Sequence, residues 1–418
     1  MSDELQVVTD PAEVGMDPTR LGRIDDRLAR YVEDGQLPGF LVTVARHGEL
    51  VHVGRYGSRD VENGRPVELD TRWRIFSMTK PITSVAAMML YEEGAFQLTD
   101  PIARWLPEFG ETRVYVAGST MKPVTSPQVE PIRVWHLLTH MSGLTYGFHH
   151  AHPVDAMYRA MGHEWGTPPG ADSAEVCRQW ASVPLVFQPG TEWNYGVSTD
   201  VLGRLVEVVS GQSLDEFFAA RIFAPLGMAE TSFGLRPEDD PDSLARLYAA
   251  TPGQPGGAAT GFAPLDAMGQ AALQKPAFLS GGGGLVSTAG DYLRFIEMLR
   301  RGGAYDGGRL LGPRTLAHMV GNHIPGGQDL ETFGRPLFAE TPLRGVGFGL
   351  GFSMIIDPAR YGVVSSVGDY SWGGAASTAF YVDPVEDLTV SFYTQLLPSS
   401  TLPIRNYLRQ LVNQAIVD

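Results

Sequence analysis

The chain has 418 residues, of which 43% are hydrophobic and 19% are charged, as is ordinary for a globular protein that buries a large core. Its formal net charge of -15 at pH 7 argues against nucleic-acid and anionic-membrane partners, because both attract basic surfaces. The single cysteine, Cys177, excludes an intrachain disulfide framework and a cysteine-rich zinc site.

The N-terminal stretch has none of the features of a targeting segment. Residues 1–6 are acidic and polar, and no apolar signal-peptide core follows them. No uninterrupted apolar run elsewhere approaches the length needed to cross a bilayer. We therefore expect a cytoplasmic protein whose partners include neither a membrane nor a nucleic acid.

The N-terminal part of the chain combines a helix signal with strand signals. Residues 17–32 carry apolar side chains at helical spacing, which predicts an amphipathic helix. Residues 40–46 and 49–56 are two apolar segments on either side of a His-Gly turn, which is typical of a β-hairpin. A short strand at residues 73–76 is then expected to lead into Ser77.

A Ser-x-x-Lys tetrad follows, formed by Ser77 and Lys80 at the start of an apolar segment that ends at Gly94. On a helix the two side chains would lie one turn apart on the same face. In the first turn of a helix, free backbone N–H groups and the helix dipole favour negative charge. A serine hydroxyl beside an amine in this setting has the chemistry of an acylation centre.

The same pattern occurs again at Ser119 and Lys122. Prolines and a glycine surround this copy and prevent a long helix, so we interpret it as a loop. The alternative for the first copy is a helix-capping serine and a surface lysine. However, the chain contains only three lysines, Lys80, Lys122 and Lys275. Arginine, which it uses elsewhere, could not act beside Ser77, because it keeps its proton at working pH.

Residues 96–284 are predicted to be mainly helical, with loops rich in proline and glycine. One loop contains His149, His150 and His152. No carboxylate lies at a convincing ligand spacing from them, so we interpret this loop as polar and expect no metal site. Residues 251–261 are predicted to be a flexible loop or an extended connection.

Tyr195 lies between a turn and a helix. A phenol near a lysine ammonium would have its anionic form favoured, so Tyr195 could relay or abstract the proton of Ser77. The alternative is a tyrosine that only packs at the start of a helix. Composition alone leaves both interpretations open.

The C-terminal part returns to strand signals and ends in a helix. The predicted strands cover residues 347–356, 361–367, 377–383 and 388–394, and the predicted helices cover residues 291–301 and 402–417. The last two strands are joined by a turn composition and should form a hairpin.

These elements predict an α/β fold with an inserted all-α domain. The two strand-rich ends, residues 1–95 and 285–418, should share one antiparallel sheet flanked by helices. Residues 96–284 should form the mainly helical domain, with the active site between the two domains.

A third candidate segment precedes the strand at residues 377–383. It contains Trp372, Gly373, Gly374 and Ala375. Paired glycines let a backbone approach a ligand closely, and the N–H that follows them could point at a developing oxyanion. A tight turn between strands explains the same residues equally well.

Taken in this order, the Ser77 helix start, Tyr195 after Pro-Gly-Thr-Glu-Trp, and Trp372-Gly-Gly resemble the motifs of one family. It is the serine β-lactamase-like superfamily of penicillin-binding proteins and class C β-lactamases, and the match is closest to family VIII carboxylesterases. Residues 136–144 also resemble a segment common there. The resemblance covers nearly the whole chain and implies a β-lactamase/DD-peptidase-like fold with no cofactor.

The resemblance also implies roles for these residues. Ser77 matches the nucleophile that forms an acyl-enzyme, and Lys80 matches the lysine that lowers the proton affinity of the serine and the tyrosine. Tyr195 matches the general base and acid. The N–H groups of Ser77 and Ala375 match the oxyanion hole. Which of Lys80 and Tyr195 takes the first proton stays open.

Two departures from the β-lactamase pattern concern the substrate. Val197 stands where β-lactamases usually have asparagine, and Trp372 stands where they have the lysine that helps to hold the substrate carboxylate. Their loss argues against β-lactams and peptide carboxylates and favours uncharged esters. The candidate substrate-binding residues are Trp372, Gly373, Gly374, Tyr146, Phe148 and Trp193.

The resulting hypothesis is a serine carboxylesterase that hydrolyses short-chain acyl or aryl esters, with a small-molecule ester as its partner. No Gly-x-Ser-x-Gly pentapeptide is present, which argues against an α/β-hydrolase. Alternatives are an acyltransferase of the statin-side-chain type, a weak β-lactamase or DD-peptidase-like hydrolase, and a binding protein that kept the fold without catalysis.

Overall fold

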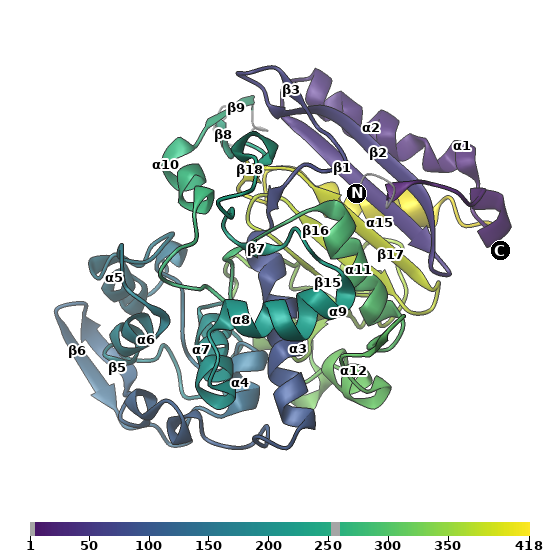
Figure 1. Cartoon of the computed structure of the whole chain (residues 1–418). Helices are drawn as coiled ribbons and strands as arrows, with labels where there is room; N and C mark the ends of the chain where they lie inside the picture. The colour runs from purple at the N-terminus through teal and green to yellow at the C-terminus, as the bar shows by residue number, and fades with distance from the viewer. Residues whose placement is uncertain (1–4, 252–259) are drawn as a thin grey trace.

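The computed structural model describes residues 5–251 and 260–418, and a large antiparallel sheet is its main element (Figure 1). The order of its strands is β13-β14-β15-β16-β17-β1-β2-β3. These strands are β1 (Gly39–Arg46), β2 (Glu49–Asp60), β3 (Arg65–Pro66), β13 (Val346–Phe348), β14 (Ser353–Ile355), β15 (Tyr370–Gly373), β16 (Ala379–Asp383) and β17 (Leu388–Tyr393).

Strands from the two ends of the chain are neighbours in this sheet. β1 pairs with β17, and Leu41 lies opposite Tyr393. Figure 1 shows the purple N-terminal strands beside the yellow C-terminal ones. The expectation that the two strand-rich ends share one sheet is therefore confirmed.

Helices cover both faces of the sheet, so its central strands are buried on both sides. All eight residues of β1 are buried. Because side chains alternate along a strand, Phe40 joins one core with α2 (Arg23–Glu33) and α15 (Ile404–Asn413), and Leu41 joins the opposite core with α11 (Ala289–Arg300). The predicted antiparallel sheet flanked by helices is present.

The remaining elements surround these two cores. The other α-helices are α1 (Pro18–Leu21), α3 (Thr79–Glu92), α4 (Val134–Leu138), α5 (Pro153–Ala160), α6 (Ser173–Ala181), α7 (Ser198–Ser210), α8 (Leu214–Phe218), α9 (Ala224–Leu226), α10 (Asp266–Gly269), α12 (Pro313–Met319), α13 (Leu330–Phe333) and α14 (Pro358–Tyr361). Within the described residues, no helix is both long enough and apolar enough to cross a membrane.

The other strands form small sheets. These are β4 (Trp73–Arg74) with β10 (Leu285–Ser287) and β7 (Ser232–Phe233), β5 (Val114–Ser119) with β6 (Lys122–Ser126), β11 (Ala304–Tyr305) with β12 (Gly308–Arg309), and β18 (Leu396–Leu397) with β8 (Tyr248–Thr251) and β9 (Gly261–Pro264). Strands β5 to β9 lie in the segment predicted to be mainly helical. The predicted domain boundaries stay a prediction.

Two strand predictions need correction. Residues 347–356 form two strands, β13 and β14, because the chain turns back between them with Gly351 at a φ of 100°. Residues 361–367 are not a strand. Asp357 caps α14 through the backbone N–H of Arg360, and the helix ends at Gly362, which has a φ of 83°. Most of the connection predicted at residues 251–261 lies outside the described residues.

The second Ser-x-x-Lys copy lies on a β-hairpin. Ser119 ends β5 and Lys122 begins β6, and the Ser119 hydroxyl accepts a hydrogen bond from the Lys122 backbone N–H at 3.2 Å. Both residues are strand ends on either side of the hairpin turn, so the prediction that they lie in a loop is wrong. This copy therefore lacks the helical geometry of the first one.

A buried ion pair fixes α15 to β15, the strand that leads into residues 372–375, which we call the glycine motif. Arg409 of α15 donates to both carboxylate oxygens of Asp369, at 2.9 and 2.8 Å, just before β15 begins. Both side chains are almost completely buried. Burial raises the pKa of Asp369, and the Arg409 charge opposes that rise. The Asp369 carboxylate therefore needs the Arg409 charge to stay ionised in this buried position.

We expect Asp369→Ala to lower the free energy of unfolding by about 3 to 5 kcal/mol, because it leaves the buried Arg409 guanidinium without its counter-charge. The matched control is Asp306→Ala, which removes a carboxylate that is 96% exposed and pairs with Arg301 on the surface. That change should have little effect, because exposed ion pairs contribute little. Urea unfolding measures both, and equal losses would contradict the prediction.

Candidate active site

The segment before α3 holds Ser77 at the start of a buried helix. β4 pairs with β10, and the chain then enters a 3-10 turn, Phe76–Met78, that runs into α3. Phe76 has a φ of 43°, which is unusual for a bulky residue and is found where the surrounding structure imposes it. The Tyr292 hydroxyl donates a hydrogen bond to the Met78 carbonyl at 2.9 Å and so stabilises this turn.

The side chains of Ser77, Lys80 and Tyr195 are in contact with one another. The sequence analysis predicted that they belong to the same site. The Lys80 ammonium donates to Ser77 Oγ at 3.1 Å, and the Tyr195 hydroxyl lies 2.6 Å from the same oxygen. Both distances allow direct proton transfer. Ser77 is 9% exposed, and Lys80 and Tyr195 are each 2% exposed. The geometry therefore offers Ser77 two partners for its proton, in a site largely shielded from water.

Lys80 is held by two further acceptors. Its Nζ donates to the Tyr146 hydroxyl at 2.9 Å and to the Gly282 carbonyl at 2.6 Å. Burial lowers the pKa of Lys80 from 10.5 to about 8, although the Asp200 and Glu340 carboxylates raise it. A substantial fraction of Lys80 is therefore neutral near pH 8 and able to accept a proton.

Asp200, which the sequence analysis missed, supports Lys80 from α7. Its Oδ1 accepts from the Ser280 hydroxyl at 2.5 Å and from the Gly282 N–H at 2.9 Å. A Cβ at Gly282 would collide with the Asp200 carboxylate, so the close approach requires glycine. Two signals for Asp200 were available in the sequence. One was its position five residues after Tyr195, and the other was the run of glycines at residues 281–284. Nothing in the sequence indicates that Asp200 and this glycine run are in contact.

The environment of Tyr195 corrects one expectation. We expected the lysine ammonium to favour the phenolate, whereas burial and the Glu340 carboxylate raise the pKa of Tyr195 well above its ordinary value. Its ring packs edge-on against Trp372 and His140, with centroids 5.4 and 5.0 Å away. Tyr195 is therefore a protonated phenol in the resting site.

The glycine motif lies against the start of α3. A Cβ at Gly374 would collide with the Ile75 carbonyl and the Thr378 hydroxyl. Within the described residues, none accepts a hydrogen bond from the Ala375 N–H. This arrangement places Ala375 close to the helix start and fits the predicted oxyanion hole, whose role stays a prediction.

The aromatic candidates divide into two groups. Tyr146 and Phe148 are partly exposed and stack with centroids 4.6 Å apart. Phe148 also stacks on Trp165, at 4.5 Å, a residue that the sequence analysis did not single out. Trp193 is 1% exposed and lies parallel to the ring of Tyr195. Tyr146 and Phe148 are therefore candidates for the pocket wall, and Trp193 supports the phenol.

The three neighbouring histidines have separate contacts. His149 Nε2 donates to the Tyr195 carbonyl at 2.7 Å, His150 pairs with Glu164, and His152 caps α5 by accepting from the Val154 N–H. In the described parts of the chain, no group of three or more His, Cys, Asp or Glu side chains could hold a metal ion.

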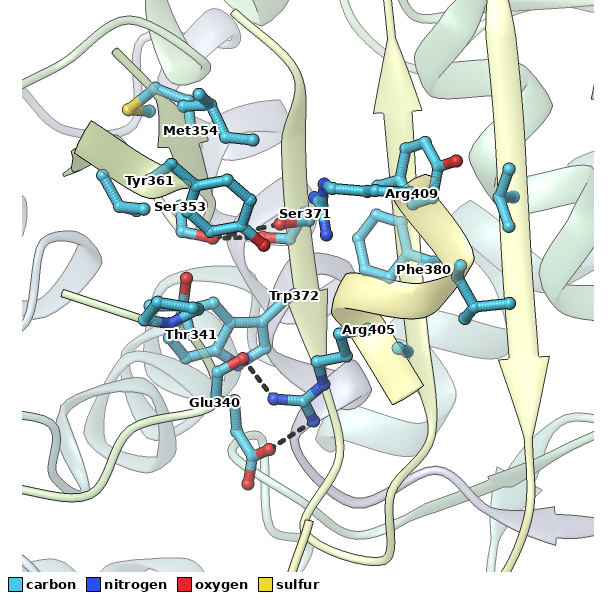
Figure 2. Close-up of a pocket in the computed structure, with 17 residues that line it drawn as sticks. Glu340, Thr341, Ser353, Met354, Tyr361, Ser371, Trp372, Phe380, Arg405 and Arg409 are labelled. Carbon is cyan, nitrogen blue, oxygen red and sulfur yellow. Dashed lines mark hydrogen bonds and ion pairs between the residues drawn. The ribbon is translucent and has the colours of Figure 1, made fainter. Parts of the chain in front are cut away.

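A small cavity of about 20 Å³ lies beside Trp372 and is lined from the other side by residues of α15 (Figure 2). Its lining includes Glu340 and Arg405 but none of Ser77, Lys80 and Tyr195. Trp372 therefore borders both this cavity and Tyr195, whose ring centroid is 5.4 Å away.

The model of the family described as Beta-lactamase matches residues 24–414. The chain belongs to this family. Protein Rv1367c of Mycobacterium tuberculosis is 35% identical over 368 residues, which are 87% of each chain. Esterase EstB of Burkholderia gladioli is 32% identical over 92% of this chain and 93% of its own. The solved structure of EstCE1, "a hydrolase with promiscuous acyltransferase activity", has a TM-score of 0.76 at 26% identity and covers 98% of this chain and 99% of its own.

These comparisons confirm the predicted membership in the serine β-lactamase-like superfamily and the predicted fold class. The similarity to an esterase over nearly the full length agrees with the resemblance to family VIII carboxylesterases. The role of each site residue stays a prediction.

We expect Lys80 to titrate near pH 8, and Asp200→Asn to lower that pKa further, because the Asp200 carboxylate stabilises the ammonium. Protein labelled with ¹³C at lysine Cε should give three signals, since the chain has three lysines, and Lys80→Arg assigns one of them. A pH titration by NMR follows its shift. Asp306→Asn removes a distant carboxylate and should leave the pKa unchanged. A higher Lys80 pKa in Asp200→Asn would contradict the assignment.

Proposed function

We propose that this protein is a serine carboxylesterase that hydrolyses uncharged short-chain acyl or aryl esters through an acyl-Ser77 intermediate. The observation that carries the proposal is the contact of Ser77 Oγ with both Lys80 Nζ and the Tyr195 hydroxyl. A nucleophile in contact with a base that is partly neutral near pH 8 and with a second proton carrier has what acyl transfer requires.

The resting protonation states suggest an order of proton transfers. Tyr195 holds its proton, so neutral Lys80 takes the proton of Ser77 as its oxygen attacks the ester carbonyl. The N–H groups of Ser77 and Ala375 stabilise the negative charge on the carbonyl oxygen. Tyr195 then protonates the leaving alcohol and regains a proton from Lys80. Water repeats the sequence on the acyl-enzyme and releases the acid.

The walls of the site favour neutral substrates. Val197 and Trp372, at the positions of the polar β-lactamase residues, are buried apolar side chains. The partly exposed rings of Tyr146 and Phe148 provide an apolar surface for the acyl or aryl group. The similarity to Esterase EstB supports an ester substrate.

An acyltransferase is the second candidate, and the description of EstCE1 as a hydrolase with promiscuous acyltransferase activity favours it. The two reactions differ only in whether water or an alcohol attacks the acyl-enzyme. Adding alcohols to a hydrolysis assay and measuring the ratio of free acid to new ester distinguishes them. Weak β-lactam hydrolysis stays a prediction that a β-lactam hydrolysis assay can test. A cytoplasmic location also stays a prediction, and cell fractionation can test it.

Ser77→Ala should abolish hydrolysis of 4-nitrophenyl butyrate, because it removes the hydroxyl that forms the proposed acyl-enzyme. Ser119→Ala is the matched control, since it changes the serine of the second Ser-x-x-Lys copy, and it should keep full activity. Intact-protein mass spectrometry after brief exposure to the ester should show an acyl adduct on the wild type and not on Ser77→Ala. Full activity in Ser77→Ala would disprove the proposal.

Tyr195→Phe should lower kcat by about 10² to 10⁴, the usual contribution of a general acid or base, with a small effect on KM. The ring and its contacts with Trp372 remain, so the fold should be kept. Tyr305→Phe, a change at a partly exposed tyrosine of β11, is the control and should have no effect. A kcat within threefold of the wild type would remove Tyr195 from the mechanism.

A further inference from the structure

The guanidinium of Arg405 contacts the backbone of the glycine motif. Arg405 of α15 donates from Nη2 to the carbonyls of Gly374 and Thr378, each at 3.3 Å. A Cβ at Gly373 would collide with the Arg405 guanidinium where it now lies, so glycine allows this close approach. The guanidinium therefore contacts the residue that precedes Ala375, the proposed donor to the oxyanion.

Glu340 neutralises this cation. Arg405 Nη2 lies 2.6 Å from Glu340 Oε2, and Nη1 donates to the Glu340 backbone carbonyl, as the dashed lines in Figure 2 show. Ser399 donates to the same Oε2 at 2.9 Å. The Glu340 side chain is 1% exposed and that of Arg405 is 20% exposed. Both terminal nitrogens of Arg405 are therefore engaged by acceptors of the protein itself.

The negative charge of Glu340 also affects Lys80 and Tyr195. Arg405 connects the Glu340 carboxylate to the Gly374 carbonyl, next to Ala375. After burial, which is the larger cause, this carboxylate acts to raise the pKa values of Lys80 and Tyr195. Within the described residues, none donates a hydrogen bond to Glu340 Oε1. Arg405, the cation beside the glycine motif, is therefore already paired and offers no free pair of terminal nitrogens to a second carboxylate.

We propose that Glu340 is a specificity-determining residue that makes the site reject esters carrying a carboxylate. A free arginine in this position would bind a carboxylate through two parallel hydrogen bonds. Glu340 occupies the hydrogen-bond donors of Arg405 that would otherwise bind a substrate carboxylate. The site is therefore suited to uncharged esters. This inference rests on the proposed esterase function and names the residue responsible for its substrate class.

The test compares 4-nitrophenyl butyrate with the monoanionic 4-nitrophenyl hemisuccinate, which differs mainly by a carboxylate. The wild type should have a kcat/KM at least about tenfold lower for the anionic ester. Equal values would overturn the inference. No hydrolysis of either ester would instead overturn the proposed function.

Glu340→Gln keeps a hydrogen-bond acceptor for Arg405 and removes the charge. It should raise the ratio of anionic to neutral kcat/KM by about tenfold. Glu331→Gln, which removes an exposed carboxylate paired with Arg360, is the control and should leave the ratio unchanged. An unchanged ratio in Glu340→Gln, with the neutral ester still hydrolysed, would overturn the inference.

A second variant covers the case in which Glu340→Gln does not fold, as judged by lost hydrolysis of both esters and altered thermal unfolding. Arg405→Gln leaves Glu340 without its counter-charge, so it should lower the ratio of anionic to neutral kcat/KM below that of the wild type. A ratio equal to or higher than that of the wild type in Arg405→Gln would overturn the inference.

Discussion

The exclusion of water from Lys80 is the constraint on which the rest of the site depends. An amine in water stays protonated at neutral pH, and only burial brings its pKa near 8. Burial requires that each N–H of the ammonium find an acceptor, and Ser77, Tyr146 and Gly282 provide them. α3 is accordingly buried on all sides from Thr79 to Leu90.

The acceptors of Lys80 come from distant parts of the chain, so the fold must bring them together. Tyr146 belongs to the segment after α4, and Gly282 belongs to the glycine run before β10. Asp200 connects the glycine run to α7, and α7 packs against α3. The helices therefore position the candidate base Lys80, and the end of β15 positions Ala375, one of the two candidate oxyanion donors.

For physical reasons, the sequence identified the candidate catalytic residues more readily than the residues that surround them. Ser77 and Lys80 are neighbours on one helix turn, and local spacing is readable from sequence. Asp200, Glu340 and Arg405 act through contacts between segments far apart in the chain, which periodicity does not report. Residues 361–367 have β-branched side chains, but the cap at Asp357 and the turn at Gly362 override their strand preference. The pKa of Tyr195 depends on total burial, which only the packed fold determines.

The pairing of β1 with β17 has a consequence for the order in which the protein forms during synthesis. The ribosome releases Ser77 and Lys80 early, while the partner of β1 is among the last strands to emerge. Until then one edge of β1 carries unpaired backbone groups, and such edges recruit other chains. Because contacts between distant segments form slowly, the nascent chain has an exposed apolar strand for most of its elongation. The topology therefore leaves this edge of β1 unpaired until β17 has been synthesised, and Ala375 can join Ser77 only after β15 has emerged.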